Sequence, residues 1–166
     1  MVKAIPFEPG DKARKHPDCC LYLSKSLVDA VWEDLPPEPK ITLSIGSGSG
    51  LLEAILTAPG NKCIECVELE TLREIHKYIA EKAMHYVSGM QSLCERAGHA
   101  DAWLFVYPRD PALVSRYIER FGNGSVGKIF WLGPRQDWDD LVVKLAEQNH
   151  AAFHSPYQRH AVVGWE

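Results

Sequence analysis

A glycine-rich turn is the strongest chemical signal in this sequence. Gly46, Gly48 and Gly50 occupy alternate positions directly after the short apolar run 41–45. Glycine has no Cβ, so the backbone here can adopt positive φ, turn sharply and approach a ligand closely. The run 51–56 then restores an apolar helical pattern, and the first N–H groups of such a helix have no partner within it. The order of strand, glycine turn and helix predicts a nucleotide-type binding site.

The spacing of the glycines distinguishes between classes of nucleotide. A loop that binds ATP phosphates needs a Lys and a Ser or Thr after its last glycine, but Leu51 and Leu52 stand there. A dinucleotide fingerprint would place its third glycine at position 51 rather than at Gly50. ATP binding is therefore disfavoured, and a nicotinamide-dependent oxidoreductase remains only as an alternative.

The segment LSIGSGSGLLE resembles the first motif of class I S-adenosylmethionine-dependent methyltransferases. The resemblance implies S-adenosylmethionine (SAM) as the cofactor and places these residues around it: Ser44, Gly46, Ser47, Gly48 and Gly50. In this family an acidic residue at the end of the second strand binds the ribose hydroxyls, and Glu68 stands in the matching place within CVELE. Glu70 is the fallback, and the simpler alternative for Glu68 is a solvated carboxylate at a strand end.

The sequence departs from the family pattern at two positions. Ser44 stands where the family usually has an acidic residue that helps to organise the methionine end of the cofactor. Met90 stands where a family aspartate often faces the adenine, so we expect the backbone or Gln91 to make that contact. Both departures favour the alternative of a related protein that has lost methyl transfer.

The loops after the fourth and fifth predicted strands are expected to surround the methyl acceptor, because ligands of open α/β sheets bind outside the carboxyl ends of the strands. The candidates for removing a proton from the acceptor are Tyr107, His154 and His160. The candidates for binding the acceptor are Tyr22, Arg109, Trp131 and Tyr157. Each also has a simpler interpretation: a packed turn for Tyr107, a surface position for the histidines, and the core for Trp131. Aromatic rings and arginine suggest an anionic or planar acceptor.

Apolar patterns predict the elements that hold these residues. Strands are expected at 41–45, 63–69, 85–88, 102–107 and 128–132, with two closing strands near 151–153 and 161–165. Helices are expected behind the cap Ser24, after Gly50, after Asp110 and after Asp137, and a short helix or turn at 71–78. This alternation predicts an α/β three-layer sandwich with a mostly parallel seven-stranded sheet that ends in an antiparallel hairpin.

Five cysteines in a chain without a recognisable secretory signal predict free thiols in a reducing compartment, so we expect a cytoplasmic protein. Cys63 and Cys66 have the CxxC spacing of zinc or redox sites, yet no second pair of ligands follows at zinc-site spacing. The segment around them also alternates like a strand. Small residues in a buried strand are the preferred interpretation, and no metal is expected.

Length and charge limit the function further. The 166 residues predict one domain, with 1–23 as a lead or lid segment and 24–166 as the core. A net charge of −4 without a basic stripe argues against nucleic acid, and no apolar stretch is long enough for a bilayer. The leading hypothesis is SAM-dependent methyl transfer to a small-molecule substrate. A binding module or non-methylating catalyst on the same fold is the alternative, and the sequence does not determine the oligomeric state.

Overall fold

One parallel sheet organises the protein. The computed structural model describes residues 2–147 and 158–161 of the chain. The strands are β3 (Ile41–Ile45), β4 (Cys63–Leu69), β5 (Met84–Val87), β6 (Ala102–Val106), β7 (Lys128–Leu132) and β8 (Gln158–Ala161). They lie in the order β5-β4-β3-β6-β7-β8, and every neighbouring pair is parallel. Three strands, β3, β4 and β7, have the bounds that their apolar runs predict.

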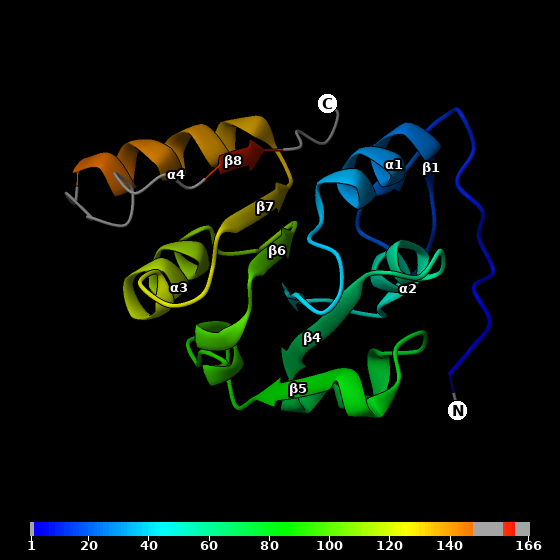
Figure 1. The fold of residues 1–166 in the computed structure, drawn as a ribbon, viewed down its shortest axis with the longest axis horizontal. Coiled ribbons are helices and arrows are strands. Elements are labelled where there is room, and N and C mark those ends of the chain that lie inside the picture. The colour runs from blue at the N-terminus through cyan, green and yellow to red at the C-terminus, as the bar shows by residue number, and fades with distance from the viewer. Residues whose placement is uncertain (1, 148–157, 162–166) are drawn as a thin grey trace.

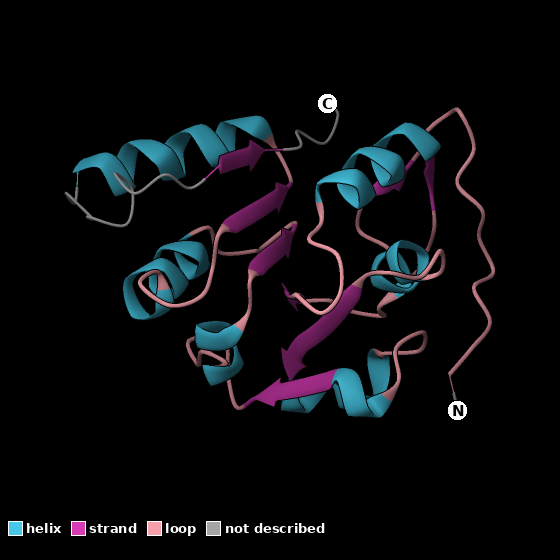
Figure 2. Ribbon diagram, viewed as in Figure 1, coloured by secondary structure: helices cyan, strands magenta, loops and turns pink. Residues whose placement is uncertain are grey.

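Helices cover both faces of the sheet. Helices α1 (Lys25–Asp34) and α2 (Leu51–Thr57) lie on one side, while α3 (Ala112–Phe121) and α4 (Arg135–Glu147) lie on the other (Figures 1 and 2). The connections on either side of β5 hold only short 3₁₀ helices: η1 (Glu70–Ile75), η2 (Glu81–Ala83) and η3 (Glu95–His99). The short helix expected at 71–78 is therefore a 3₁₀ helix that begins and ends earlier.

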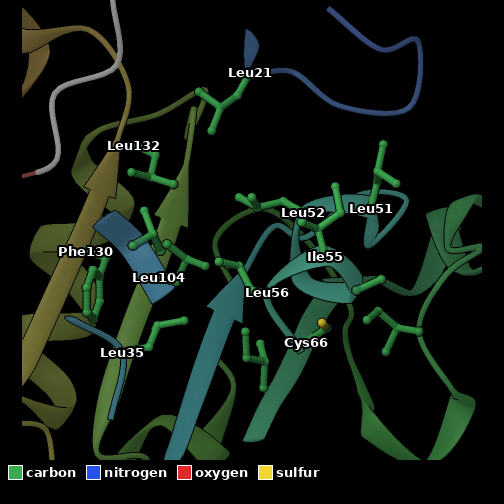
Figure 3. Close-up of a cluster of buried hydrophobic side chains, with 14 of the residues drawn as sticks. Leu21, Leu35, Leu51, Leu52, Ile55, Leu56, Cys66, Leu104, Phe130 and Leu132 are labelled. Atoms are coloured by element: carbon green, nitrogen blue, oxygen red, sulfur yellow. The ribbon is translucent and has the colours of Figure 1, made fainter. Parts of the chain in front are cut away.

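Two hydrophobic cores separate the three layers. Alternate residues of β6 point to opposite faces, as the pleat requires. Leu104 packs toward α2 and its Leu56 (Figure 3), whereas Trp103 and Phe105 pack toward α3, where both rings meet Tyr117 edge-on. A strand that is covered on both faces needs apolar residues at consecutive positions, which explains why β6 has the sequence AWLFV. The predicted three-layer α/β architecture is confirmed.

Polar side chains accept hydrogen bonds from first-turn N–H groups of two helices, at the positions that the sequence predicts. Ser24 Oγ accepts a hydrogen bond from the Leu27 N–H at 3.2 Å and so caps α1. Asp110 accepts one from the Ala112 N–H at 3.0 Å ahead of α3. The carboxylate of Asp110 also forms an ion pair with Arg116 at 3.2 Å, one helical turn into α3, rather than with its sequence neighbour Arg109.

The edge of the sheet differs from the prediction. The described residues form six strands in the sheet, and β8 runs parallel to β7 instead of forming an antiparallel edge. The physical reason is α4, which follows β7 and carries the chain back along the sheet, so the next strand begins at the same end as β7. Most of the predicted closing hairpin, 151–153 and 162–165, lies outside the described residues.

An antiparallel hairpin does occur, but in the N-terminal lead. Strands β1 (Arg14–Lys15) and β2 (Tyr22–Leu23) pair with each other, and Leu23 is fully buried in the core shared with α1. The lead segment is thus packed against the sheet layers. None of the helices in the described residues is long and apolar enough to cross a membrane.

Candidate ligand pocket

The order in which strands are added to the sheet reverses between β3 and β6. From β3 the chain builds outward to β4 and β5, then returns to place β6 on the other side of β3. Ligands of open α/β sheets bind at such a switch point. A pocket of about 770 Å³ lies there, lined by the glycine turn, the start of α2, Val106 at the end of β6, and all but His16 and His76 of two further segments, 15–20 and 74–77. This volume suits a nucleoside-sized ligand.

The three glycines have the backbone that their spacing predicts. Gly46, Gly48 and Gly50 all have positive φ, at 78°, 58° and 79°. A Cβ added at Gly46 or Gly48 would meet nothing within 4 Å, so these two positions border open space beside the pocket. A Cβ at Gly50 would lie 2.4 Å from Ile79 Cγ1. The first two glycines keep the pocket clear of side chains, while the third allows close packing under α2.

Backbone N–H groups of the turn donate hydrogen bonds to acceptors within the protein. The N–H groups of Gly46 and Ser47 donate to the Val67 carbonyl, and that of Gly50 donates to the Ser47 carbonyl. The Gly48 N–H donates to Glu68 Oε2 at 2.8 Å. A phosphate-binding loop instead directs such N–H groups at its ligand. The turn is therefore shaped for close approach to a ligand rather than for holding phosphate.

Glu68 lies at the end of β4, beside the glycine turn, as expected. Besides the bond from Gly48, its Oε1 accepts a hydrogen bond from the Leu69 N–H at 2.9 Å, and the residue is only 8% exposed. Glu68 is thus not a solvated carboxylate. Glu70, the fallback, is exposed and pairs with Arg73 on the surface. In this conformation Glu68 orders the turn, and contact with a ribose stays a prediction.

Glu53 is the residue that the sequence reasoning missed. It lies on the first turn of α2, is 1% exposed and lines the pocket. Ser44 Oγ at the end of β3 donates a hydrogen bond to Glu53 Oε1 at 2.6 Å. Burial raises the pKa of Glu53 to about 7. The signal in the sequence was a single acidic residue in the otherwise apolar helix LLEAILT.

The N-terminal segment forms one wall of the pocket. Asp18 anchors it: its carboxylate accepts hydrogen bonds from Lys77 Nζ and, at 2.7 Å, from the Tyr78 hydroxyl. The Asp18 carbonyl accepts a third from Ser49 Oγ in the glycine turn. These bonds, above all that from Lys77, hold the pKa of Asp18 below its usual value. The lining on this side comes from residues within 15–20; Tyr22, on β2, is 55% exposed, and its role in binding the acceptor stays a prediction.

The other predicted acceptor residues lie outside the pocket lining. Tyr107 follows β6 with a φ of 45° and is 43% exposed, and Arg109 is exposed. Trp131 is 1% exposed and packs against Trp138 with ring centroids 5.9 Å apart, so it belongs to the core. Met90 and Gln91 are exposed beyond β5. Roles for these residues in binding stay predictions.

The C-terminal candidates are only partly described. His154 and Tyr157 lie outside the described residues. His160 is in β8, where its backbone lies opposite Phe130 of β7. Their roles as base or acceptor contact stay predictions.

The cysteines are free thiols in the structure. Cys63 and Cys66 lie on β4 three residues apart, and an odd separation places them on opposite faces of a strand. Their thiols therefore point to opposite faces of β4 and are not placed to bind one metal ion together. The described part of the chain contains no group of three or more potential metal ligands.

Comparisons with known proteins add little beyond this geometry. No protein-family model matches the chain, and no curated protein matches it either. Among solved structures, the chain is similar to a protein from Methanococcus maripaludis provisionally assigned as an S-adenosyl-L-methionine-dependent methyltransferase. Identity is 17%, the TM-score is 0.45, and the match covers 74% of this chain but only 62% of that one. The chain therefore spans less than two thirds of that protein.

Proposed function

We propose that the protein binds SAM in the pocket beside the glycine turn and transfers its methyl group to a small-molecule acceptor. The observation that carries this proposal is the engagement of the turn amides, those of 46–48 and Gly50, with acceptors inside the protein. Dinucleotides and ATP need such amides for their phosphates, whereas SAM has none. The turn thus favours a nucleoside ligand without phosphate.

The charge of the pocket fits the same ligand. SAM carries a sulfonium, an ammonium and a carboxylate, so its net charge is positive because of the sulfonium, and Glu53 supplies a buried carboxylate in the pocket wall. When bound, SAM would supply an activated methyl group: the acceptor's nucleophile attacks the methyl carbon in line with the carbon–sulfur bond, which breaks and leaves S-adenosylhomocysteine as the neutral thioether. The protein's part is to align the two reactants, which is the main requirement of such a displacement. The open faces of Gly46 and Gly48 let the ligand approach the backbone, and residues within 15–20 form one side of the pocket.

A second candidate, binding without methyl transfer, also has an observation in its favour. Among the described residues, the lining of the pocket contains no histidine and no tyrosine. A hydroxyl acceptor would need a base to remove its proton. Under the leading proposal Tyr107, His154 or His160 supplies that base.

Calorimetric titration with SAM, NAD⁺ and ATP tests the binding step, and we expect only SAM to bind. Gly48→Val should abolish that binding because its side chain would occupy the open space beside the turn. Gly60→Val is the matched control: Gly60 also has positive φ and open space, but it lies outside the pocket lining. Binding of NAD⁺ without SAM, or equal SAM affinity in both variants, would contradict the proposal.

Release of S-adenosylhomocysteine separates the two candidates. Wild-type protein is incubated with SAM and a panel of small hydroxyl, amine and thiol acceptors, and the product is quantified chromatographically. Acceptor-dependent release supports methyl transfer. Binding of SAM with no release from any acceptor favours the binding module.

A further inference from the structure

We infer that Glu53 is the group by which this pocket recognises positive charge, so that it selects a cationic sulfonium ligand over the neutral thioether of the same nucleoside. This inference rests on the proposed function and deepens it. The sequence resemblance does not assign any role to Glu53. Glu53 is buried, has no cationic neighbour among the described residues and lines the pocket.

The burial of Glu53 is unusual for a carboxylate. It is 1% exposed, and the other residues of α2 from Leu51 to Leu56 are buried and apolar. Removing a carboxylate from water is costly unless it gains a cation or several hydrogen-bond donors. A helix of this kind would be stabilised by an apolar residue at position 53. The carboxylate therefore has a use other than packing.

The partners of Glu53 within the protein do not compensate for that burial. Its hydrogen-bond donors among the described residues are the Ser44 hydroxyl and the N–H of Glu53 itself, and no ion pair of the described chain includes Glu53. Glu68 at the end of β4 adds a second negative charge nearby, and the thiols of Cys66 and Cys19 flank it from β4 and the N-terminal segment. None of these groups carries a positive charge.

The lysines of the pocket do not supply a positive charge to Glu53. Lys77 forms its ion pair with Asp18, and Lys15 lies on the exposed strand β1. The exposed residue Glu74 adds a further carboxylate at the pocket. The buried end of the pocket thus has negative charge without a cation, and a cationic ligand centre would supply the missing partner.

A consequence follows for the proton on Glu53. Because burial raises its pKa to about 7, the carboxyl is partly protonated in the ligand-free protein near neutral pH. A cationic ligand favours the charged form, so binding of SAM should release a proton at pH 6 to 7. S-adenosylhomocysteine has the same ammonium and carboxylate as SAM, but its sulfur is neutral, so it stabilises the charged form of Glu53 less. Selectivity for SAM over S-adenosylhomocysteine should therefore rise with pH through this range.

Calorimetric titration of wild-type protein with SAM and S-adenosylhomocysteine at pH 6 and pH 8 tests the inference. We expect preference for SAM to be about tenfold greater at pH 8, and heats in buffers of different ionisation enthalpy to reveal proton release at pH 6. Glu53→Gln should weaken SAM by about tenfold or more while changing S-adenosylhomocysteine by less than about threefold. Glu119→Gln is the control, an exposed carboxylate on α3 outside the pocket lining, and it should leave the preference unchanged.

The outcomes separate this inference from the proposed function. If wild-type protein binds SAM but Glu53→Gln keeps the same SAM preference and pH dependence, the inference is wrong and the proposed function stands. If wild-type protein binds neither ligand, both fail. The pH dependence in wild-type protein needs no variant, so misfolding of Glu53→Gln cannot mask the result.

Discussion

Glu68 shows how one carboxylate at a strand end can order a glycine turn. Its two oxygens accept hydrogen bonds from the Gly48 and Leu69 N–H groups. Glu68→Gln places an amide N–H against one of these donors and removes the charge from both bonds. We expect SAM affinity to fall by roughly ten- to a hundred-fold, the range of charge-assisted hydrogen bonds, in a calorimetric titration.

Glu70→Gln is the matched control for this prediction. Glu70 lies two residues further on, is exposed and pairs with Arg73 on the surface. An exposed pair of this kind contributes little, so we expect SAM affinity to stay within about twofold of wild type. Loss of binding in Glu70→Gln with none in Glu68→Gln would mean that the wrong carboxylate has been placed at the ribose.

Glu53 should also make the stability of the ligand-free protein depend on pH. Its pKa in the folded protein is about 7 against a reference value of 4.5. Between these values the folded protein holds a proton that the unfolded chain releases, so the free energy of unfolding falls as the pH rises from 4.5 to 7. Glu53→Gln removes this loss. We expect a gain of roughly 2 to 3 kcal/mol at pH 8 and almost none at pH 4.5.

Urea denaturation at the two pH values measures this difference. The same variant should lose selectivity for SAM, so stability and ligand recognition would change in opposite directions. A Glu53→Gln protein that is less stable than wild type at pH 8 would show that the carboxylate has a stabilising partner in the folded state.

At the scale of elements, Gly50 decides whether α2 can pack against segment 76–80. Gly50→Ala combines an unfavourable positive φ with a contact of 2.4 Å to Ile79 Cγ1 and one of 3.3 Å to Ile79 Cβ, so the backbone must move. We expect a loss of about 2 to 4 kcal/mol in the free energy of unfolding. Gly60→Ala has a similar φ but open space, and its loss should be about 1 kcal/mol. Equal losses in the two variants would show that the packing against Ile79 does not matter.

The N-terminal segment is the second element whose position determines the pocket. Asp18→Ala removes the acceptor of Lys77 and Tyr78 while leaving the sheet untouched. We expect faster hydrogen exchange of the amides in 15–20, with exchange of the central strands β3 and β6 unchanged. Because the pKa of Asp18 is lowered, wild-type protein should show the same loosening only when the pH falls below the usual range for an aspartate. Unchanged exchange in Asp18→Ala would mean that other contacts hold the segment.

At the scale of the whole molecule, the cysteines report on folding. Cys66 and Cys94 are buried, Cys20 is exposed, and Cys19 and Cys63 are partly covered. Burial raises the pKa of Cys19 to about 12 and also raises that of Cys63, so neither has much reactive thiolate at pH 8. With a colorimetric thiol reagent we expect one of the five thiols to react quickly in native protein and all five in urea. Fewer than five in urea, or stoichiometric zinc, would contradict the assignment of free thiols.

The sequence by itself determined the features that depend on neighbours along the chain. The apolar runs predicted the bounds of β3, β4 and β7, Ser24 predicted the start of α1, and the three glycines predicted the turn between strand and helix. These features follow from side-chain periodicity and backbone sterics within a few residues. The parallel α/β architecture followed because strands and helices alternate.

Only the tertiary structure decided which distant residues meet. The contact between Ser44 and Glu53 depends on how α2 packs on β3, and the anchor at Asp18 joins residues 59 and 60 positions apart. The parallel pairing of β8 with β7 depends on where α4 carries the chain. In the sequence Glu53 stands out as the acidic residue of an otherwise apolar helix, but that pattern does not name its partners. Its burial, its raised pKa and its place in the pocket arise from contacts between elements, and local patterns do not encode these.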